Sequence, residues 1–259
     1  GSSRGKLYLI PGRATFPARI DLGDAGQRDE LGIVEIFGVD DCDHFGSCIA
    51  AADFDRDGFD DIAVSAGVSR SGAFPSNLAE GPAGTFCSTG QGGGDGPDET
   101  RQDSGGVYVI YGRANWPAAI ELSAPPADVA IYYGQNGGDY FGEDVRAGDF
   151  DGDGVPELGV GALTASAPST EPGGTPRRRS GIGYVFWGSE LVRGERLDVR
   201  SLPSTNPRVS RLYGEGSEDI GADTIALVDV DRDGLAEVVF ASPLFDPTGR
   251  SGAGDLKII

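Results

Sequence analysis

Short apolar stretches alternate with polar, glycine-rich turns along almost the whole chain. The apolar stretches are rich in Val, Ile, Tyr and Phe and are bounded by Gly, Asp and Pro, which is typical of strands that end in tight turns. No stretch shows the spacing of an amphipathic helix, and none approaches the ~18 apolar residues needed to cross a membrane. The pattern predicts an all-β protein.

The apolar stretches recur in similar units. Segments that contain an acidic loop lie at 43–67, 139–163 and 218–243. A second kind of segment recurs at 5–12, 105–112, 181–188 and 252–259, and a third kind at 33–38, 129–134 and 209–214. Each unit therefore has four strand candidates: one that enters the acidic loop (Cys48–Ala52), one that leaves it (Asp61–Ser65), and the two further segments. Four short strands per repeat are the make-up of a propeller blade.

The count of strand candidates predicts an incomplete ring. Thirteen candidates make three blades and one extra strand in a single domain, 1–259, with blade parts at about 5–38, 43–134, 139–214 and 218–259. Propellers close with about four to eight blades. The chain is therefore expected to be a fragment of a longer propeller, or to self-associate and complete a ring.

Charge restricts the partners. The 259 residues include 41 acidic and 21 basic side chains, which give a formal charge of −20. Such a surface repels nucleic-acid phosphates and anionic membranes and attracts metal cations. We therefore expect neither a nucleic-acid partner nor membrane insertion.

The acidic residues concentrate in three loops that share the pattern D-x-D-x-D-G-x-x-[DE]. Carboxylates at positions 1, 3, 5 and 9, with the backbone carbonyl of position 7, offer the oxygen ligands that Ca²⁺ prefers. The glycine at position 6 permits a sharp turn. The sequence predicts about three Ca²⁺ sites, formed by Asp53, Asp55, Asp57, Phe59 and Asp61; by Asp149, Asp151, Asp153, Val155 and Glu157; and by Asp229, Asp231, Asp233, Leu235 and Glu237.

Other interpretations of the loops are weaker. An EF-hand needs a glutamate at position 12, but Val64, Val160 and Phe240 stand there. Mg²⁺ demands stricter octahedral geometry. The three loops contain no His or Cys, which argues against zinc or copper. The aspartates could instead make only Asx-turns, although three loops in the same frame argue against this.

These loops and their flanks resemble FG-GAP repeats of integrin α subunits. Phe45-Gly46, Phe141-Gly142 and Ile220-Gly221 stand at the FG position; Ser65-Ala66-Gly67, Gly161-Ala162-Leu163 and Ala241-Ser242-Pro243 stand at the GAP position. The related tails at 12–22 and 112–122 look like bacterial members of the family. The resemblance implies a seven-bladed β-propeller with calcium loops on one face. It also implies a secreted or cell-surface module that binds an extracellular protein or glycan.

The remaining features leave alternatives open. The cysteines Cys42, Cys48 and Cys87 allow one disulfide, for which Cys42–Cys87 is the favoured pair and three reduced thiols the alternative. The long loops 68–104 and 164–180 are interpreted as surface decoration, with binding loops as the alternative.

No catalytic constellation is evident, and His44 is expected to be a solvated turn residue. We therefore expect a non-catalytic, calcium-dependent adhesion or recognition module. The alternatives are a propeller attached to, or acting as, an extracellular hydrolase or lyase, and a purely structural spacer stabilised by calcium.

Overall fold

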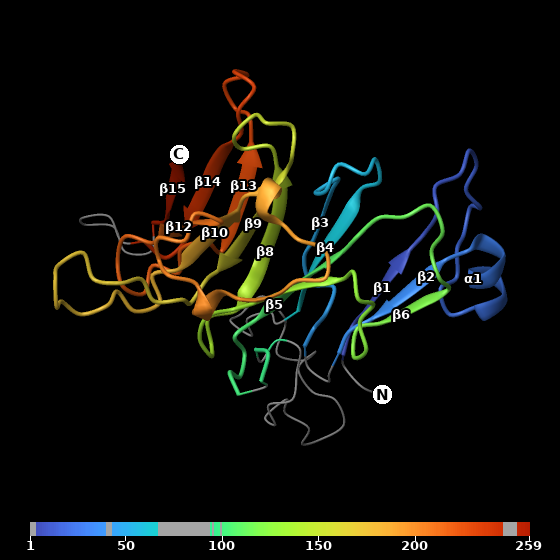
Figure 1. Ribbon diagram of the computed structural model, residues 1–259, viewed down its shortest axis with the longest axis horizontal. Coiled ribbons are helices and arrows are strands. Elements are labelled where there is room, and N and C mark those ends of the chain that lie inside the picture. The colour runs from blue at the N-terminus through green and yellow to red at the C-terminus, as the bar shows by residue number, and fades with distance from the viewer. Residues whose placement is uncertain (1–3, 40–42, 67–93, 95, 99, 246–252) are drawn as a thin grey trace.

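The chain folds into four β-sheets that follow one another across the molecule (Figure 1). The computed structural model describes residues 4–39, 43–66, 94, 96–98, 100–245 and 253–259. The expected all-β fold is confirmed. No helix in these ranges is long and apolar enough to cross a membrane.

Each sheet is small and mostly antiparallel. The first has three strands, in the order β1 (Lys6–Leu9), β2 (Val34–Phe37) and β6 (Ala119–Glu121). The second has five, in the order β11 (Arg196–Asp198), β7 (Ala130–Tyr133), β5 (Gly106–Ile110), β4 (Asp61–Ala66) and β3 (Ile49–Ala52).

The third sheet has the order β12 (Val209–Tyr213), β10 (Ile182–Phe186), β9 (Glu157–Ala162) and β8 (Phe141–Gly148). The fourth has the order β13 (Thr224–Val228), β14 (Glu237–Ser242) and β15 (Asp255–Ile258). Strand β8 contacts β3 and β4 of the second sheet and β13 of the fourth, so the third sheet packs between the second and the fourth.

All thirteen predicted strands are present, together with two that the sequence analysis missed. Strand β6 runs parallel to β2, with Ile120 opposite Ile36. Strand β11 runs parallel to β7, with Leu197 opposite Tyr132. In both places the chain leaves the third strand of one sheet, adds an edge strand to the preceding sheet, and returns.

One short helix, α1 (Ala25–Leu31), is present in a stretch where the sequence shows no amphipathic spacing. The side chain of Asp24 caps its first turn by accepting a hydrogen bond from the N–H of Gln27 at 3.2 Å. Gly32 ends the helix in the left-handed conformation, with φ of 65°. Only Leu31 of the helix is buried, so this two-turn helix carries no apolar stripe that a periodicity search could detect. Two single turns of 3₁₀ helix, Gly188–Glu190 and Val199–Ser201, complete the helical structure of the described residues.

Aromatic side chains fill the space between the second and third sheets. Phe141 is completely buried. Its ring centroid lies 5.3 Å from that of Tyr184 and 6.1 Å from that of Phe186, and both pairs meet edge to face. The ring of Tyr132 on the neighbouring sheet lies 5.2 Å from Phe186. These contacts fix the relative position of two adjacent sheets.

A glycine precedes each of the equivalent strands β1, β5 and β10, because the backbone of the next repeat lies against it. Gly5, Gly105 and Gly181 all have φ near 80°. A Cβ added to Gly105 would lie 2.1 Å from the carbonyl oxygen of Phe141, and one added to Gly5 would lie 2.2 Å from that of Phe45. The recurring glycines of the sequence therefore mark the points where consecutive repeats touch.

The predicted alignment of the third repeat was wrong by one residue. Gly221, not Ile220, occupies the place of Phe141: its N–H donates to the carbonyl of Ser180 at 2.8 Å, as that of Phe141 donates to Ser104 at 2.9 Å. The ring of Phe240 takes the vacated space, since a Cβ added to Gly221 would lie 2.7 Å from its Cε1 atom. Without a ring at the first position, the sequence offered Ile220 as the closer match.

Two predictions fall partly or wholly outside the described residues. Cys42 and Cys87 lie there, so the proposed disulfide stays a prediction, while Cys48 is a free, half-buried thiol. Most of the loop 68–104 also lies outside the described residues, so its role stays a prediction. The second long loop, 164–180, folds back on itself: the N–H and C=O groups of Ala167 pair with those of Arg177 at 3.1 and 2.9 Å.

Candidate metal centres

The three acidic loops are the hairpin turns between the first and second strands of their sheets, β3–β4, β8–β9 and β13–β14. They project from the same side of the molecule in Figure 1. Positions 4 and 6 of every loop have positive φ values, from 59° at Arg56 to 96° at Gly234. This double left-handed turn draws the carboxylates of each loop inward.

Backbone amides hold the carboxylates in a repeated arrangement. The N–H of the position-6 glycine donates to the position-1 aspartate in each loop, at 2.9, 3.0 and 3.1 Å. The N–H of position 7 donates to the position-5 aspartate, at 2.9, 2.7 and 2.9 Å. The Asx-turns considered from the sequence are therefore real. They use one oxygen of most of these carboxylates and leave the other free.

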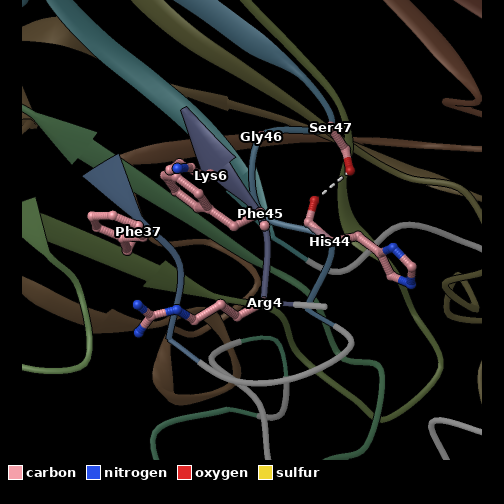
Figure 2. Close-up of a pocket in the computed structure, with 8 residues that line it drawn as sticks. Arg4, Lys6, Phe37, His44, Phe45, Gly46 and Ser47 are labelled. Carbon is pink, nitrogen blue, oxygen red and sulfur yellow. Dashed lines mark hydrogen bonds between the residues drawn. The ribbon is translucent and has the colours of Figure 1, made fainter. Parts of the chain in front are cut away.

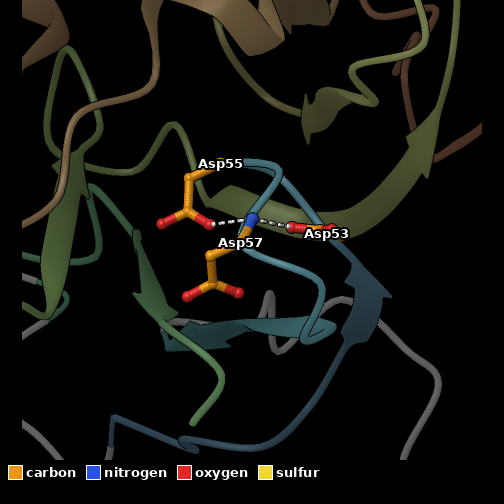
Figure 3. A group of neighbouring side chains, drawn as sticks. All are labelled: Asp53, Asp55 and Asp57. Carbon is orange, nitrogen blue, oxygen red and sulfur yellow. Dashed lines mark hydrogen bonds between the residues drawn. The ribbon is translucent and has the colours of Figure 1, made fainter.

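Each loop brings three carboxylates together. Their nearest oxygens lie within 4.8 Å of one another. The second loop unites Asp149, Asp151 and Glu157, and the third unites Asp229, Asp231 and Glu237. The first loop unites Asp53, Asp55 and Asp57 instead (Figure 3). Of the predicted carboxylates, Asp61, Asp153 and Asp233 lie outside these groups. For the position-7 carbonyls of Phe59, Val155 and Leu235, metal binding stays a prediction.

The position-9 carboxylate begins the second strand and joins the loop to its sheet. In the first loop, Asp61 is fully buried and accepts the N–H of Phe54 at 2.9 Å and of Gly112 at 2.7 Å. Glu157 accepts the N–H groups of Phe150 and Gly188 in the same way. Because aspartate is one methylene shorter than glutamate, Asp61 makes these bonds without reaching the other carboxylates of its loop.

Burial raises the pKa of both carboxyls. The pKa of Asp61 rises from 3.8 to about 6, although the two amide hydrogen bonds oppose the rise. The pKa of Glu157 also rises, mainly because of burial. Clustered carboxylates without a cation are costly, and a bound divalent ion would favour their ionised form.

The donor set fits a hard cation. The clustered atoms are all carboxylate oxygens, the ligands that calcium and magnesium prefer. Within the described residues, Asp149 Oδ1 is buried and accepts no hydrogen bond. An unpartnered buried oxygen is expensive, and a cation between Asp149, Asp151 and Glu157 would satisfy it. The three clusters could therefore hold metal ions. Position 12 lies inside β4, β9 and β14, which agrees with rejection of the EF-hand.

Sequence reasoning missed two arginines that contact the loops. Arg193, from the connection between β10 and β11, forms ion pairs with Asp55 and Asp57. Arg56, at position 4 of the first loop, reaches the second loop, where its Nη2 lies 3.4 Å from Asp153 Oδ1. Neither contact has a sequence signal, because Arg193 is more than 130 residues from its partners and Arg56 is 97 residues from Asp153.

A different site, an open depression, lies where the first and second sheets meet (Figure 2). Arg4, Lys6, Phe37 and His44 are among its lining residues. Both cations already have partners: Arg4 Nη1 lies 3.1 Å from Glu121, and Lys6 Nζ lies 2.8 Å from Glu35. His44 is an exposed turn residue with φ of 52°, as the sequence predicts.

Comparisons with known proteins agree with the repeat pattern. Residues 45–75 match the FG-GAP repeat family. The phosphatidylinositol-glycan-specific phospholipase D of Mus musculus is 32% identical over 155 residues, which are 58% of this chain and 16% of that protein. The protein of the same name from Rattus norvegicus is 27% identical over 210 residues, 81% of this chain and 20% of that protein. The chain thus spans about a fifth or less of the length of these relatives. The match shows that the chain contains an FG-GAP repeat, and the repeated hairpin loops support an FG-GAP repeat protein.

Proposed function

We propose that the chain is a calcium-binding, non-catalytic recognition module that works outside the cell. The observation that supports this best is that each of the three loops brings three carboxylates together, on the turn of a hairpin at the same side of the molecule. The unpartnered buried oxygen of Asp149 supports a cation at the second cluster.

Calcium is the ion that the chemistry favours. It takes about six to eight oxygen ligands in flexible geometry, whereas Mg²⁺ demands an octahedron. The three clusters differ in which positions converge, and a flexible coordination shell tolerates such differences. Calcium would also reduce the repulsion within a chain of net charge −20.

In this proposal the four sheets are blades or part-blades of a β-propeller. Their mostly antiparallel strands, the contacts of β8 with the second and fourth sheets, and the FG-GAP match support it. The remaining blades would come from further sequence or from other copies of the chain. Light scattering of the purified chain across a concentration series tests self-association.

Calcium binding is tested by thermal unfolding with calcium, with magnesium and with a chelator, together with elemental analysis of the bound metal. We expect about three calcium ions per chain and a higher melting temperature with calcium, because a ligand that binds only the native state stabilises it. Asp151→Ala should lose one ion. Asp60→Ala is the matched control, since Asp60 is an exposed carboxylate at position 8 of the first loop and should lose none. The same melting temperature with calcium and with chelator, together with an absence of bound metal, would falsify the proposal.

A second candidate function follows from the relatives: the chain could be a propeller portion of an extracellular hydrolase. Their name describes a phospholipase D specific for phosphatidylinositol-glycan. Assays of this chain and of its full-length gene product on a phosphatidylinositol-glycan substrate separate the possibilities. Turnover by the isolated chain would refute a non-catalytic role, whereas turnover only by a longer product would make this chain an accessory module.

The ligand is proposed to be an extracellular protein or glycan. Arrays of both kinds, probed with calcium and with chelator, test this. Calcium-dependent binding supports a recognition module, and an absence of binding on both arrays supports a structural spacer.

A further inference from the structure

We propose that Arg193 is a tethered cation that competes with calcium for the first acidic loop, so that this loop binds calcium more weakly than the other two. The inference rests on the proposed calcium sites. It concerns the chain's own control over one of them.

The geometry places Arg193 on the oxygens that a metal ion would use. Asp55 Oδ1 accepts the N–H of Asp57 at 3.2 Å, and Asp57 Oδ1 accepts the N–H of Phe59 at 2.9 Å. The Oδ2 atoms of both aspartates remain for a cation. Arg193 takes both: its Nε pairs with Asp55 Oδ2 and its Nη2 with Asp57 Oδ2. A calcium ion and the guanidinium therefore need the same two atoms.

The guanidinium is held in place by its surroundings. Its Cζ lies 4.7 Å from the ring centroid of Tyr111, a stacking contact that adds to the ion pairs. The backbone on its C-terminal side is fixed, because Gly194 donates its N–H to the carbonyl of Asp128 at 3.0 Å and Glu195 accepts that of Ile131 at 2.8 Å. Arg193 itself stays partly exposed, with 38% of its side chain accessible. It can swing into solvent without unfolding its connection.

The first loop also differs from the others in the way that such competition predicts. Among the described residues, no lysine or arginine pairs with the third cluster. The second loop has one such contact, from Arg56 to Asp153, which lies outside its cluster. The first loop is thus the one whose cluster is closed around an internal cation.

Calcium binding at the first loop should therefore displace Arg193. Because part of the population is blocked by the guanidinium, the apparent dissociation constant rises by the inverse of the free fraction. Two partly exposed ion pairs and one stacked ring suggest a weakening of about tenfold. The first site would then fill only at calcium concentrations above those that fill the other two.

The three loops carry matched reporters for a test. The amides of Gly58, Gly154 and Gly234 each donate to the position-1 aspartate of their own loop, so their NMR signals follow the three sites separately during a calcium titration. In the unaltered chain we expect Gly58 to respond at about tenfold higher calcium than the other two. In Arg193→Gln, the Gly58 midpoint should fall by about that factor while those of Gly154 and Gly234 stay unchanged.

Two further variants separate competition from general charge effects. Arg200→Gln removes an exposed arginine that makes no ion pair among the described residues, and it should leave all three midpoints in place. Arg193→Lys keeps the charge but loses the fork geometry and the stacking, and it should give an intermediate midpoint.

The inference is overturned if Gly58 titrates together with Gly154 and Gly234 in the unaltered chain, or if its midpoint is the same in Arg193→Gln and Arg200→Gln. A different failure, in which none of the three glycines responds to calcium, would instead remove the calcium proposal itself. The order of midpoints in the unaltered chain decides for or against competition even if a variant does not fold.

Discussion

Replacing Phe141 by alanine should destabilise the chain by about 4 kcal/mol. The ring is completely buried and meets Tyr184 and Phe186 edge to face. Truncation of a buried phenylalanine costs about 3–5 kcal/mol through lost burial and the cavity that remains. The loss of two aromatic pairs as well as the burial places Phe141 above the lower end of that range.

The third repeat contains a natural compensation for the same loss. Gly221 stands at the place of Phe141, and Phe240 fills the space. The residue of the second repeat that corresponds to Phe240 is Val160, also fully buried. Val160→Phe alone should cost about 1–3 kcal/mol by overpacking. Combined with Phe141→Ala, it should restore part of the lost stability, because the new ring enters the cavity.

Urea unfolding at saturating calcium, followed by the fluorescence of Trp116 and Trp187, gives the four free energies of this double-mutant cycle. We expect the double variant to be more stable than the sum of the single effects by about 1.5 kcal/mol. Phe16→Ala is the control, since this ring is 54% exposed and its loss should cost under about 0.5 kcal/mol. A loss below about 2 kcal/mol for Phe141→Ala, or additive effects in the cycle, would refute the reasoning.

Three further predictions use other features of the fold. Chelation should lower the melting temperature of the unaltered chain more than that of Asp151→Ala, measured by calorimetry; equal decreases would contradict a site at Asp151. Gly105→Ala should cost more than about 2 kcal/mol, because the Cβ would strike the Phe141 carbonyl, whereas Gly173→Ala, with open space around it, should cost only about 1 kcal/mol; similar values in urea unfolding would contradict this. Burial raises the pKa of Asp139 from 3.8 to about 6, so folding favours its protonated form, and stability should fall by up to about 3 kcal/mol as pH rises from 4 to 7. With chelator present, Asp139→Asn should show a smaller loss of stability between pH 4 and 7 than the unaltered chain. The same pH profile in both proteins would exclude Asp139 as the cause.

The sequence was sufficient for the regular strands because their signal is local. Each predicted strand combines β-branched or aromatic residues with a glycine or aspartate at its ends, and each recurs several times. The acidic loops were equally clear, since their spacing alone specifies which carboxylates share a turn. The EF-hand could be rejected without a structure because position 12 of each loop is an apolar residue.

The missed features depend on partners that are remote in the sequence. Strands β6 and β11 have only three residues each, and they become strands because an exposed edge of the preceding sheet receives them. The difference between Asp61 and Glu157 also needed coordinates. Both side chains accept hydrogen bonds from equivalent backbone amides, and only the longer glutamate also reaches the other carboxylates of its loop. The misplacement of Ile220 shows a related limit: Phe240 replaces a ring across space, which no linear alignment reveals.

Because of the parallel edge strands, a repeat of the sequence and a complete β-sheet do not cover the same residues. Leu197 of β11 is buried against the second sheet, and Asp198 pairs with Arg101 at 2.8 Å, yet both residues belong to the sequence of the following repeat. A duplication of one sequence repeat would therefore copy the edge strand that completes the preceding sheet. The sheet of the copied repeat would in turn need the edge strand of the repeat that follows it. Recombinant pieces of this chain should accordingly end after the edge strand, such as β11, rather than at the repeat boundary. A piece that ends at Gly134 would leave the outer edge of β7 uncovered.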